Sequence, residues 1–129
     1  SGVCKLTGSL HRTGGKGSSI VTEHQAKQAA FFADIKTQAI FGEHGPKPLF
    51  LVDDIHLKVI LGGLDAGQEI PAHPESQALY HFLQGTGTMS VEGDVFPIAP
   101  GATVIAPAGA KRGMHAETRI VFLAAKSVT

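Results

Sequence analysis

Short apolar runs separated by turn residues fill the sequence from Leu49 onward. Segments rich in Val, Ile, Leu and Phe alternate with Gly, Pro and Asp, as in LFLVD (49–53), IHLKVIL (55–61), ALYHFLQ (78–84), TMSVEGDVFPI (88–98), ATVIAPAG (102–109) and RIVFLAA (119–125). This spacing of short strands and turns is typical of an all-β sandwich or barrel. The prolines at 71, 74, 97, 100 and 107 fall at strand edges or turns, where a missing N–H does no harm.

The segment 78–84 is apolar on both faces of the strand that it predicts. Alternate side chains place Ala78, Tyr80 and Phe82 on one face, whereas Leu79 and His81 lie on the other. A strand of this kind is normally covered on both sides. A single small barrel covers only one face, so we expect an N-terminal helix or a second subunit, as in a homodimer, to cover the other.

The N-terminal part of the chain has a different pattern. Its first 20 residues are rich in Gly and Ser and predict a mobile arm, of which Ser1-Gly2 could be a cloning remnant. Thr22 and Gln25 then form a capping-box pattern, and alanines recur at helical spacing up to Ile35. We therefore predict one short helix over about 22–35, within an arm that spans 1–48 and precedes a barrel at 49–129.

The composition fits one compact domain and excludes several partners. Hydrophobic residues make up 43% and charged residues 17% of 129 residues, and 11 basic side chains balance 11 acidic ones. This neutral balance predicts no attraction to nucleic acid or to anionic membranes, and it leaves little repulsion between copies. The single cysteine, Cys4, excludes an internal disulfide and a cysteine-based zinc site. No apolar run approaches the ~20 residues of a membrane span, so we expect a cytoplasmic protein.

The turn spacings resemble those of the cupin family. Gly67, five residues, His73, then Glu75 and the closing Gly85 are similar to the first cupin motif. Gly101, five residues and Pro107-Ala108-Gly109 are similar to the first half of the second motif. The resemblance covers roughly residues 49–126. It implies a double-stranded β-helix, which is a jelly-roll barrel with a pocket inside.

The family's metal ligands are carried over only in part. Cupins hold a divalent metal with three histidines and a carboxylate. The resemblance places His73 at the first ligand position and Glu75 at the second. Ala78 falls at the third position and Arg112 at the fourth, while Leu79 or Tyr80 compete with Ala78 because the loop is short. None of these replacements at the third and fourth positions is a conventional ligand.

Three functions follow from this comparison. In the first, no metal is bound, a Glu75–Arg112 ion pair replaces it, and the pocket binds a small polar or anionic molecule. In the second, one divalent metal ion, held by His73 and Glu75 with a further histidine (His56, His81 or His115), serves a dioxygenase, isomerase or lyase. In the third, the barrel is a structural or accessory homodimer. The residues predicted to line the pocket are His73, Glu75, Tyr80, Phe82, Arg112 and Met114.

Overall fold

The computed structural model describes residues 29–128, and the chain divides into two compact units, Ser1–Ile35 and Lys36–Thr129. A single 3-10 turn and eleven strands make up the regular structure of the described residues. In chain order these elements are η2 (Ile35–Gln38), β1 (Ile40–Phe41), β2 (Pro46–Lys47), β3 (Leu49–Asp53), β4 (Leu57–Leu64), β5 (Glu69–Pro74), β6 (Ala78–Gln84), β7 (Gly87–Val91), β8 (Asp94–Ile98), β9 (Thr103–Ala106), β10 (Lys111–Ala116) and β11 (Ile120–Ser127).

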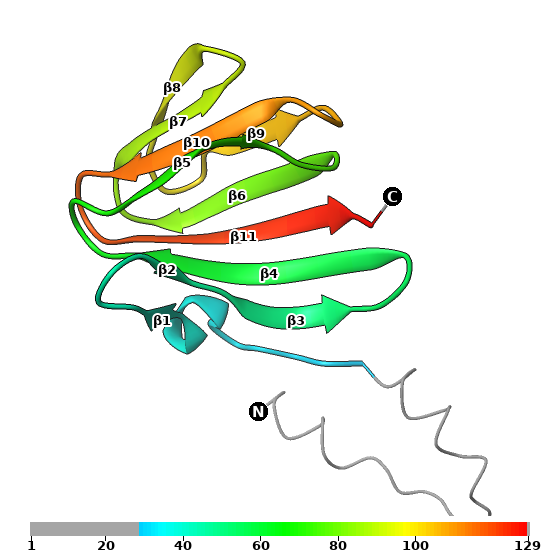
Figure 1. The fold of residues 1–129 in the computed structure, drawn as a ribbon. Helices are drawn as coiled ribbons and strands as arrows, with labels where there is room; N and C mark the ends of the chain where they lie inside the picture. Colours follow the sequence, from blue (N-terminus) through cyan, green and yellow to red (C-terminus); the bar gives the residue numbers. More distant parts are fainter. Residues whose placement is uncertain (1–28, 129) are drawn as a thin grey trace, which may run out of the picture. The chain divides into compact units, whose positions relative to one another are not determined.

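Two antiparallel sheets form the body of the second unit (Figure 1). One has five strands in the order β3-β4-β11-β6-β9, and the other has four in the order β5-β10-β7-β8. Strands β4, β5 and β6 alternate between the two sheets along the chain, as expected for a jelly roll. The all-β prediction is therefore confirmed.

The core lies between these sheets, and β6 shows how the sequence builds it. Ala78, Tyr80 and Phe82 are buried, in agreement with the predicted alternation. The Phe122 ring of β11 packs against both aromatic rings, with centroid distances of 6.1 Å to Tyr80 and 5.7 Å to Phe82. On the outward face, Leu79 is 39% exposed. The homodimer expected from that face stays a prediction.

Strand β5, like the short β1 and β2, is an element that the hydrophobic pattern did not predict. It lies at an edge of the four-stranded sheet, next to β10. Pro71 and Pro74 lie within it, and proline is tolerated in an edge strand because no ladder hydrogen bond is lost there. The edge position thus explains how a proline-containing segment enters the sheet.

The glycines that match the cupin motifs lie in turns, with backbone angles that residues with a side chain rarely adopt. Gly67, Gly85, Gly101 and Gly109 all have positive φ angles, between 82° and 96°. At Gly85, a Cβ atom would also lie only 2.0 Å from the carbonyl oxygen of Arg119. This position therefore requires glycine for two reasons: its φ angle is positive, and the backbone at the start of β11 lies too close for a side chain.

The predicted helix over 22–35 is wrong where the structure describes it. Residues 22–28 lie outside the described residues, whereas 29–32 have no regular secondary structure and 33–34 form a turn. Phe31 and Phe32 are 44% and 42% exposed, and a helix this short needs a buried apolar face to persist. Among the described residues, no helix is long and apolar enough to cross a membrane.

Candidate functional site

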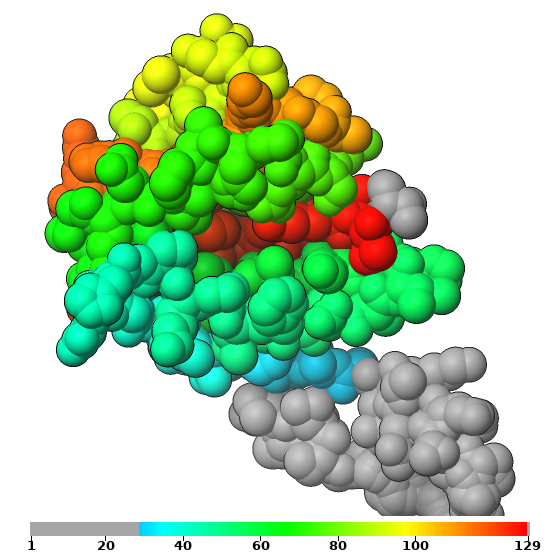
Figure 2. Space-filling view, viewed as in Figure 1, coloured from blue at the N-terminus to red at the C-terminus, as the bar shows by residue number. Residues whose placement is uncertain are grey.

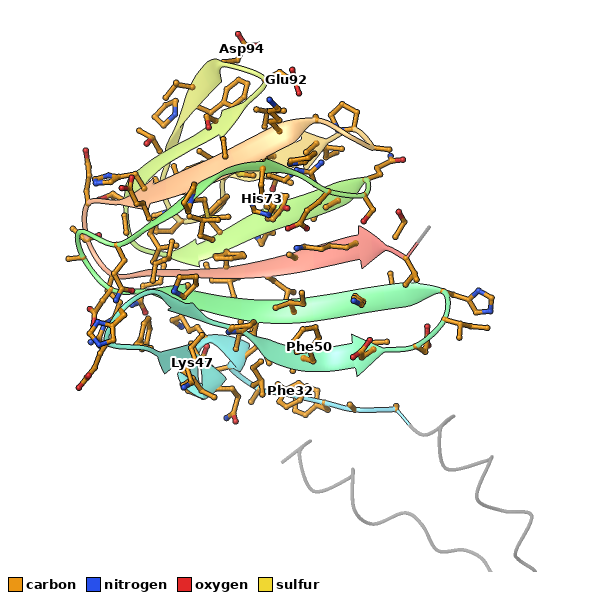
Figure 3. All side chains as sticks on the ribbon, viewed as in Figure 1. Phe32, Lys47, Phe50, His73, Glu92 and Asp94 are labelled. Carbon is orange, nitrogen blue, oxygen red and sulfur yellow. The ribbon has the colours of Figure 1, made fainter. Side chains whose placement is uncertain are left out.

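The end of β5 and the start of β10 bring several predicted site residues together. Arg112 in β10 is the cross-strand partner of His73 in β5. Glu75 follows β5 directly, and Tyr80 is buried on the inner face of β6. Figure 3 shows His73 between β5 and β6. Three of these side chains therefore come from strands, which hold them in fixed positions, while Glu75 lies in the connection between β5 and β6.

A row of three side chains, His73, Glu75 and Lys126, forms the charged end of the site. Glu75 Oε2 contacts His73 Nε2, and Glu75 Oε1 accepts a hydrogen bond from Lys126 Nζ. The second ring nitrogen of His73, Nδ1, lies 2.9 Å from the carbonyl oxygen of Pro71. A carbonyl oxygen only accepts hydrogen bonds, so Nδ1 carries a hydrogen. The contact between His73 and Glu75 then requires one further proton.

The pKa shifts place that proton on the histidine. The hydrogen bond to the Pro71 carbonyl, followed by the one to Glu75, raises the pKa of His73 above its usual 6.5. Partial burial acts to raise the pKa of Glu75, but hydrogen bonds from Lys126 and His73 outweigh it and hold the net pKa below the usual 4.5. The favoured state is an imidazolium beside a carboxylate, with the lysine ammonium on the other carboxylate oxygen.

Arg112 is a buried cation bound by the backbone. It is 2% exposed, and its guanidinium donates to the carbonyls of Ala110 (Nε, 3.0 Å; Nη2, 2.9 Å) and Ser76 (Nη1, 2.7 Å). Nη2 also donates to the carbonyls of Glu75 at 3.1 Å and Pro107 at 3.0 Å. These carbonyls belong to the β5–β6 and β9–β10 connections, so Arg112 cross-links two loops. A guanidinium has five N–H donors, and here backbone carbonyls accept most of them, while Nη1 also donates to the Tyr80 hydroxyl oxygen at 3.4 Å.

The predicted ion pair between Glu75 and Arg112 is wrong. Arg112 contacts the backbone carbonyl of Glu75, and in the described part of the chain the Glu75 carboxylate pairs with His73 and Lys126 instead. The physical reason lies in the number of donors. A buried guanidinium satisfies more of its N–H groups with carbonyls from two loops than with one carboxylate.

A cavity of about 280 Å³ lies between the sheets, next to this charged row. His73, Glu75, Tyr80, Arg112 and Met114 line it, whereas the predicted Phe82 is fully buried in the core and does not. Figure 2 shows the face on which β11 is set back between β5 and β4. The other lining residues are mostly apolar: Pro46, Pro48, Phe50, Ile60, Gly62, Ile70, Met89, Gly113, Phe122, Ala124 and Lys126.

The side chains at the family's metal positions do not fit a cupin metal centre. His73 and Glu75 are possible ligands, but Ala78 has no donor atom and Arg112 brings a positive charge to the fourth position. Among the described residues, no group of three His, Cys, Asp or Glu side chains lies close enough to hold a metal ion. The donor set therefore differs from the three histidines and one carboxylate of the family.

His81 lies on the outward face of β6, away from the cavity. Its Nδ1 is 2.7 Å from the hydroxyl oxygen of Thr103 on the neighbouring strand β9. This placement agrees with the alternation read from the sequence, which put His81 opposite Tyr80. His56 and His115, the other histidines considered as ligands, are exposed and do not line the cavity.

Lys126 is the site residue that sequence reasoning missed. It shares its strand face with Phe122 and Ala124, which also line the cavity. A lysine at the inward position of an otherwise apolar strand was therefore a readable signal, because a charge on that face needs a partner. Glu75 is that partner.

Comparisons with known proteins agree with this architecture. The family model described as "Cupin domain" matches residues 60–125. No curated protein matches the sequence. A conserved protein of unknown function from Streptococcus pyogenes has a similar structure, with a TM-score of 0.70 and 22% identity over 79% of this chain and 90% of that one.

Two further solved structures extend the likeness. A protein from Thermus thermophilus gives a TM-score of 0.69 and 23% identity, over 74% of this chain and 95% of that one. A cupin superfamily protein from Desulfitobacterium hafniense gives 0.69 and 14%, over 74% of this chain and 89% of that one. At these identities the structures show the shared fold alone, while the family model covers the strands and turns that carry the motifs. The chain belongs to the cupin family.

Proposed function

We propose that this protein binds a small anionic molecule with an apolar body, without the metal centre of its family. The observation that carries the proposal is the division of the cavity into apolar walls and one charged end. Phe50, Ile60, Met89 and Phe122 are among the residues that form the walls. Small-molecule sites are commonly mostly apolar, with a few convergent polar groups that fix the orientation of the ligand.

The charge at the polar end favours an anion. Arg112 and Lys126 each carry a positive charge, the raised pKa of His73 favours its protonated form, and Glu75 is the single carboxylate among the described lining residues. The donors of Arg112 are occupied by backbone carbonyls and the Tyr80 hydroxyl, so its contribution is the field of its charge. Lys126 Nζ has three hydrogens, one of which is used by Glu75, and it is therefore the donor available to a ligand.

A metal-dependent enzyme is less well supported. A metal at His73 and Glu75 would compete with the Lys126 ammonium for the same carboxylate. It would also have to stand near the buried Arg112 charge, which raises the cost of placing a second cation there. The metal-free site satisfies each of these charged groups.

Binding of carboxylates to purified wild-type protein tests the proposal. Isothermal titration calorimetry with hexanoate, octanoate and 4-phenylbutanoate should detect saturable binding by at least one probe. Ala124→Leu adds bulk to a lining position that is fully buried and should abolish this binding, because it fills the cavity while leaving the charged row in place. Lys126→Met should weaken binding of the carboxylates about tenfold or more, by removal of a charge-assisted hydrogen bond.

Lys111→Met is the matched control, since Lys111 is exposed and lies outside the cavity. It should bind the probes as the wild type does. Absence of binding by every carboxylate, or unchanged binding in Ala124→Leu, would contradict the proposed function.

A further inference from the structure

A second hollow, of about 430 Å³, lies beside the cavity and shares part of its wall. Phe50, Ile60, Glu75 and Lys126 line both spaces. Lys58 lines only the second one, together with Ser76, Ser127 and Val128. The Glu75–Lys126 pair therefore lies where the two spaces meet.

Lys58 and Lys126 are direct cross-strand partners in the antiparallel pair of β4 and β11. Directly opposite residues lie on the same face of a sheet, with Cβ atoms about 4.5–5.5 Å apart. Both lysines therefore point toward the side of the sheet on which the hollow lies. Two like charges in this position repel each other unless an anion lies between or beside them.

Only one of these two ammonium groups has an anionic partner. Glu75 pairs with Lys126, whereas Lys58 forms no ion pair within the part of the chain that the structure describes. Asp53 is the cross-strand neighbour of Lys58 on β3, yet these two residues form no ion pair there either. The half-buried Lys58 side chain thus lines the hollow without an ion pair to any described residue.

We infer that the anionic group of the ligand binds between Lys58 and Lys126 in the second hollow, while its apolar body occupies the cavity. This inference rests on the proposed function and adds the place where the charged head group binds, which requires an amphipathic carboxylate or a similar anion long enough to reach both spaces. Lys58 is then a specificity-determining residue, because its positive charge favours the binding of an anionic head group over that of a neutral polar one of the same size.

The test compares charged and neutral probes on full-length protein. Octanoate and 4-phenylbutanoate are titrated beside the matched alcohols octan-1-ol and 4-phenylbutan-1-ol. Lys58→Met should weaken the binding of the carboxylates about tenfold and leave that of the alcohols within about twofold. Lys58→Arg, which keeps the charge, should retain most of the carboxylate affinity, and Lys111→Met should bind both classes as the wild type does.

The outcomes separate this inference from the proposed function. Carboxylate binding that is lost in Ala124→Leu but unchanged in Lys58→Met would overturn the role of Lys58 and leave the cavity as the binding site. Equal weakening of carboxylates and alcohols in Lys58→Met would also overturn it, since that points to a general disturbance of the fold. No binding of any probe by the wild type would overturn both proposals. Asp53→Asn adds a direct check, because removal of a nearby competing anion should strengthen carboxylate binding.

Discussion

Replacement of Arg112 by methionine tests whether the buried guanidinium holds the two loops of the site together. Methionine matches the aliphatic part of the arginine side chain and has no charge, so the change removes the hydrogen bonds while it keeps much of the volume. The carbonyls of Glu75 and Pro107 also accept hydrogen bonds from the N–H groups of Gly109 and Ala110. Those two carbonyls therefore keep a donor in the variant.

The carbonyls of Ser76 and Ala110 lose the donors that Arg112 supplies. A buried polar group left without a partner costs about 1–3 kcal/mol, so the two together cost roughly 2–6 kcal/mol. Relief of the desolvation of a buried cation offsets part of this loss. We expect Arg112→Met to lower the free energy of unfolding by about 2–4 kcal/mol, which corresponds to a fall in Tm of more than about 10 °C in a domain of this size.

Urea unfolding followed by circular dichroism measures this loss, and two further variants calibrate it. Arg112→Lys keeps the charge but offers fewer donors in a different geometry, so its loss should be smaller. Arg119→Met is the matched control, because Arg119 is half-exposed and pairs with Asp65 on the surface. Its loss should be about 1–2 kcal/mol, because the variant removes that exposed ion pair and also the cation–π contact of the guanidinium with the Phe41 ring, whose centroid is 4.2 Å away. If Arg112→Met loses no more unfolding free energy than Arg119→Met, the proposed cross-link is refuted. If Arg112→Met does not fold, Arg112→Lys is compared with Arg119→Met instead.

Four other predictions concern a turn, the charged row and the absence of a metal centre. Gly85→Ala should cost more than about 2 kcal/mol in urea unfolding, because a Cβ atom there meets the Arg119 carbonyl and the φ angle is positive. The stability that Glu75 gains from its lowered pKa is present above its usual value of 4.5 and is lost as pH falls through the lower folded value, so Glu75→Gln should flatten the acid limb of stability against pH. The stability that comes from the raised pKa of His73 is present below the usual histidine pKa of 6.5 and is lost as pH rises through the higher folded value. His73→Gln should therefore flatten the fall in stability on the alkaline side of the curve. Dialysis against EDTA should leave Tm and carboxylate binding unchanged, and a fall in either would contradict the metal-free site.

The sequence predicted the barrel well because its signals are local. Strand alternation placed Tyr80 and Phe82 inward and His81 outward, and turn glycines such as Gly85 marked the corners of the sheets. The proline-containing strand β5 escaped this reading, since its place at a sheet edge is set by tertiary pairing with β10.

The site was less predictable because its contacts join distant parts of the chain. Glu75 finds its partner 51 residues away at Lys126, and Arg112 is bound by loop carbonyls, which have no side-chain signature in a sequence. The resemblance to the cupin motifs placed His73, Glu75 and Arg112 together, and the structure has them lining one cavity. The resemblance did not determine which charges pair, because a pairing depends on distances that only the folded loops fix. The Glu75–Arg112 pair was wrong for this reason.

In this site, separate side chains carry out two tasks that a single bound metal ion would combine. A metal ion ties its ligand strands together, and it supplies positive charge to whatever binds in the barrel. Here the buried Arg112 joins the two loops, but its donors are already used by backbone carbonyls and the Tyr80 hydroxyl. Lys126 faces the cavity with donors to spare. Mutation should therefore separate the two tasks. Arg112→Lys should lower stability more than it lowers carboxylate affinity. Lys126→Met should lower carboxylate affinity far more than stability, because the loss of Lys126 removes only one partly exposed ion pair from the folded protein.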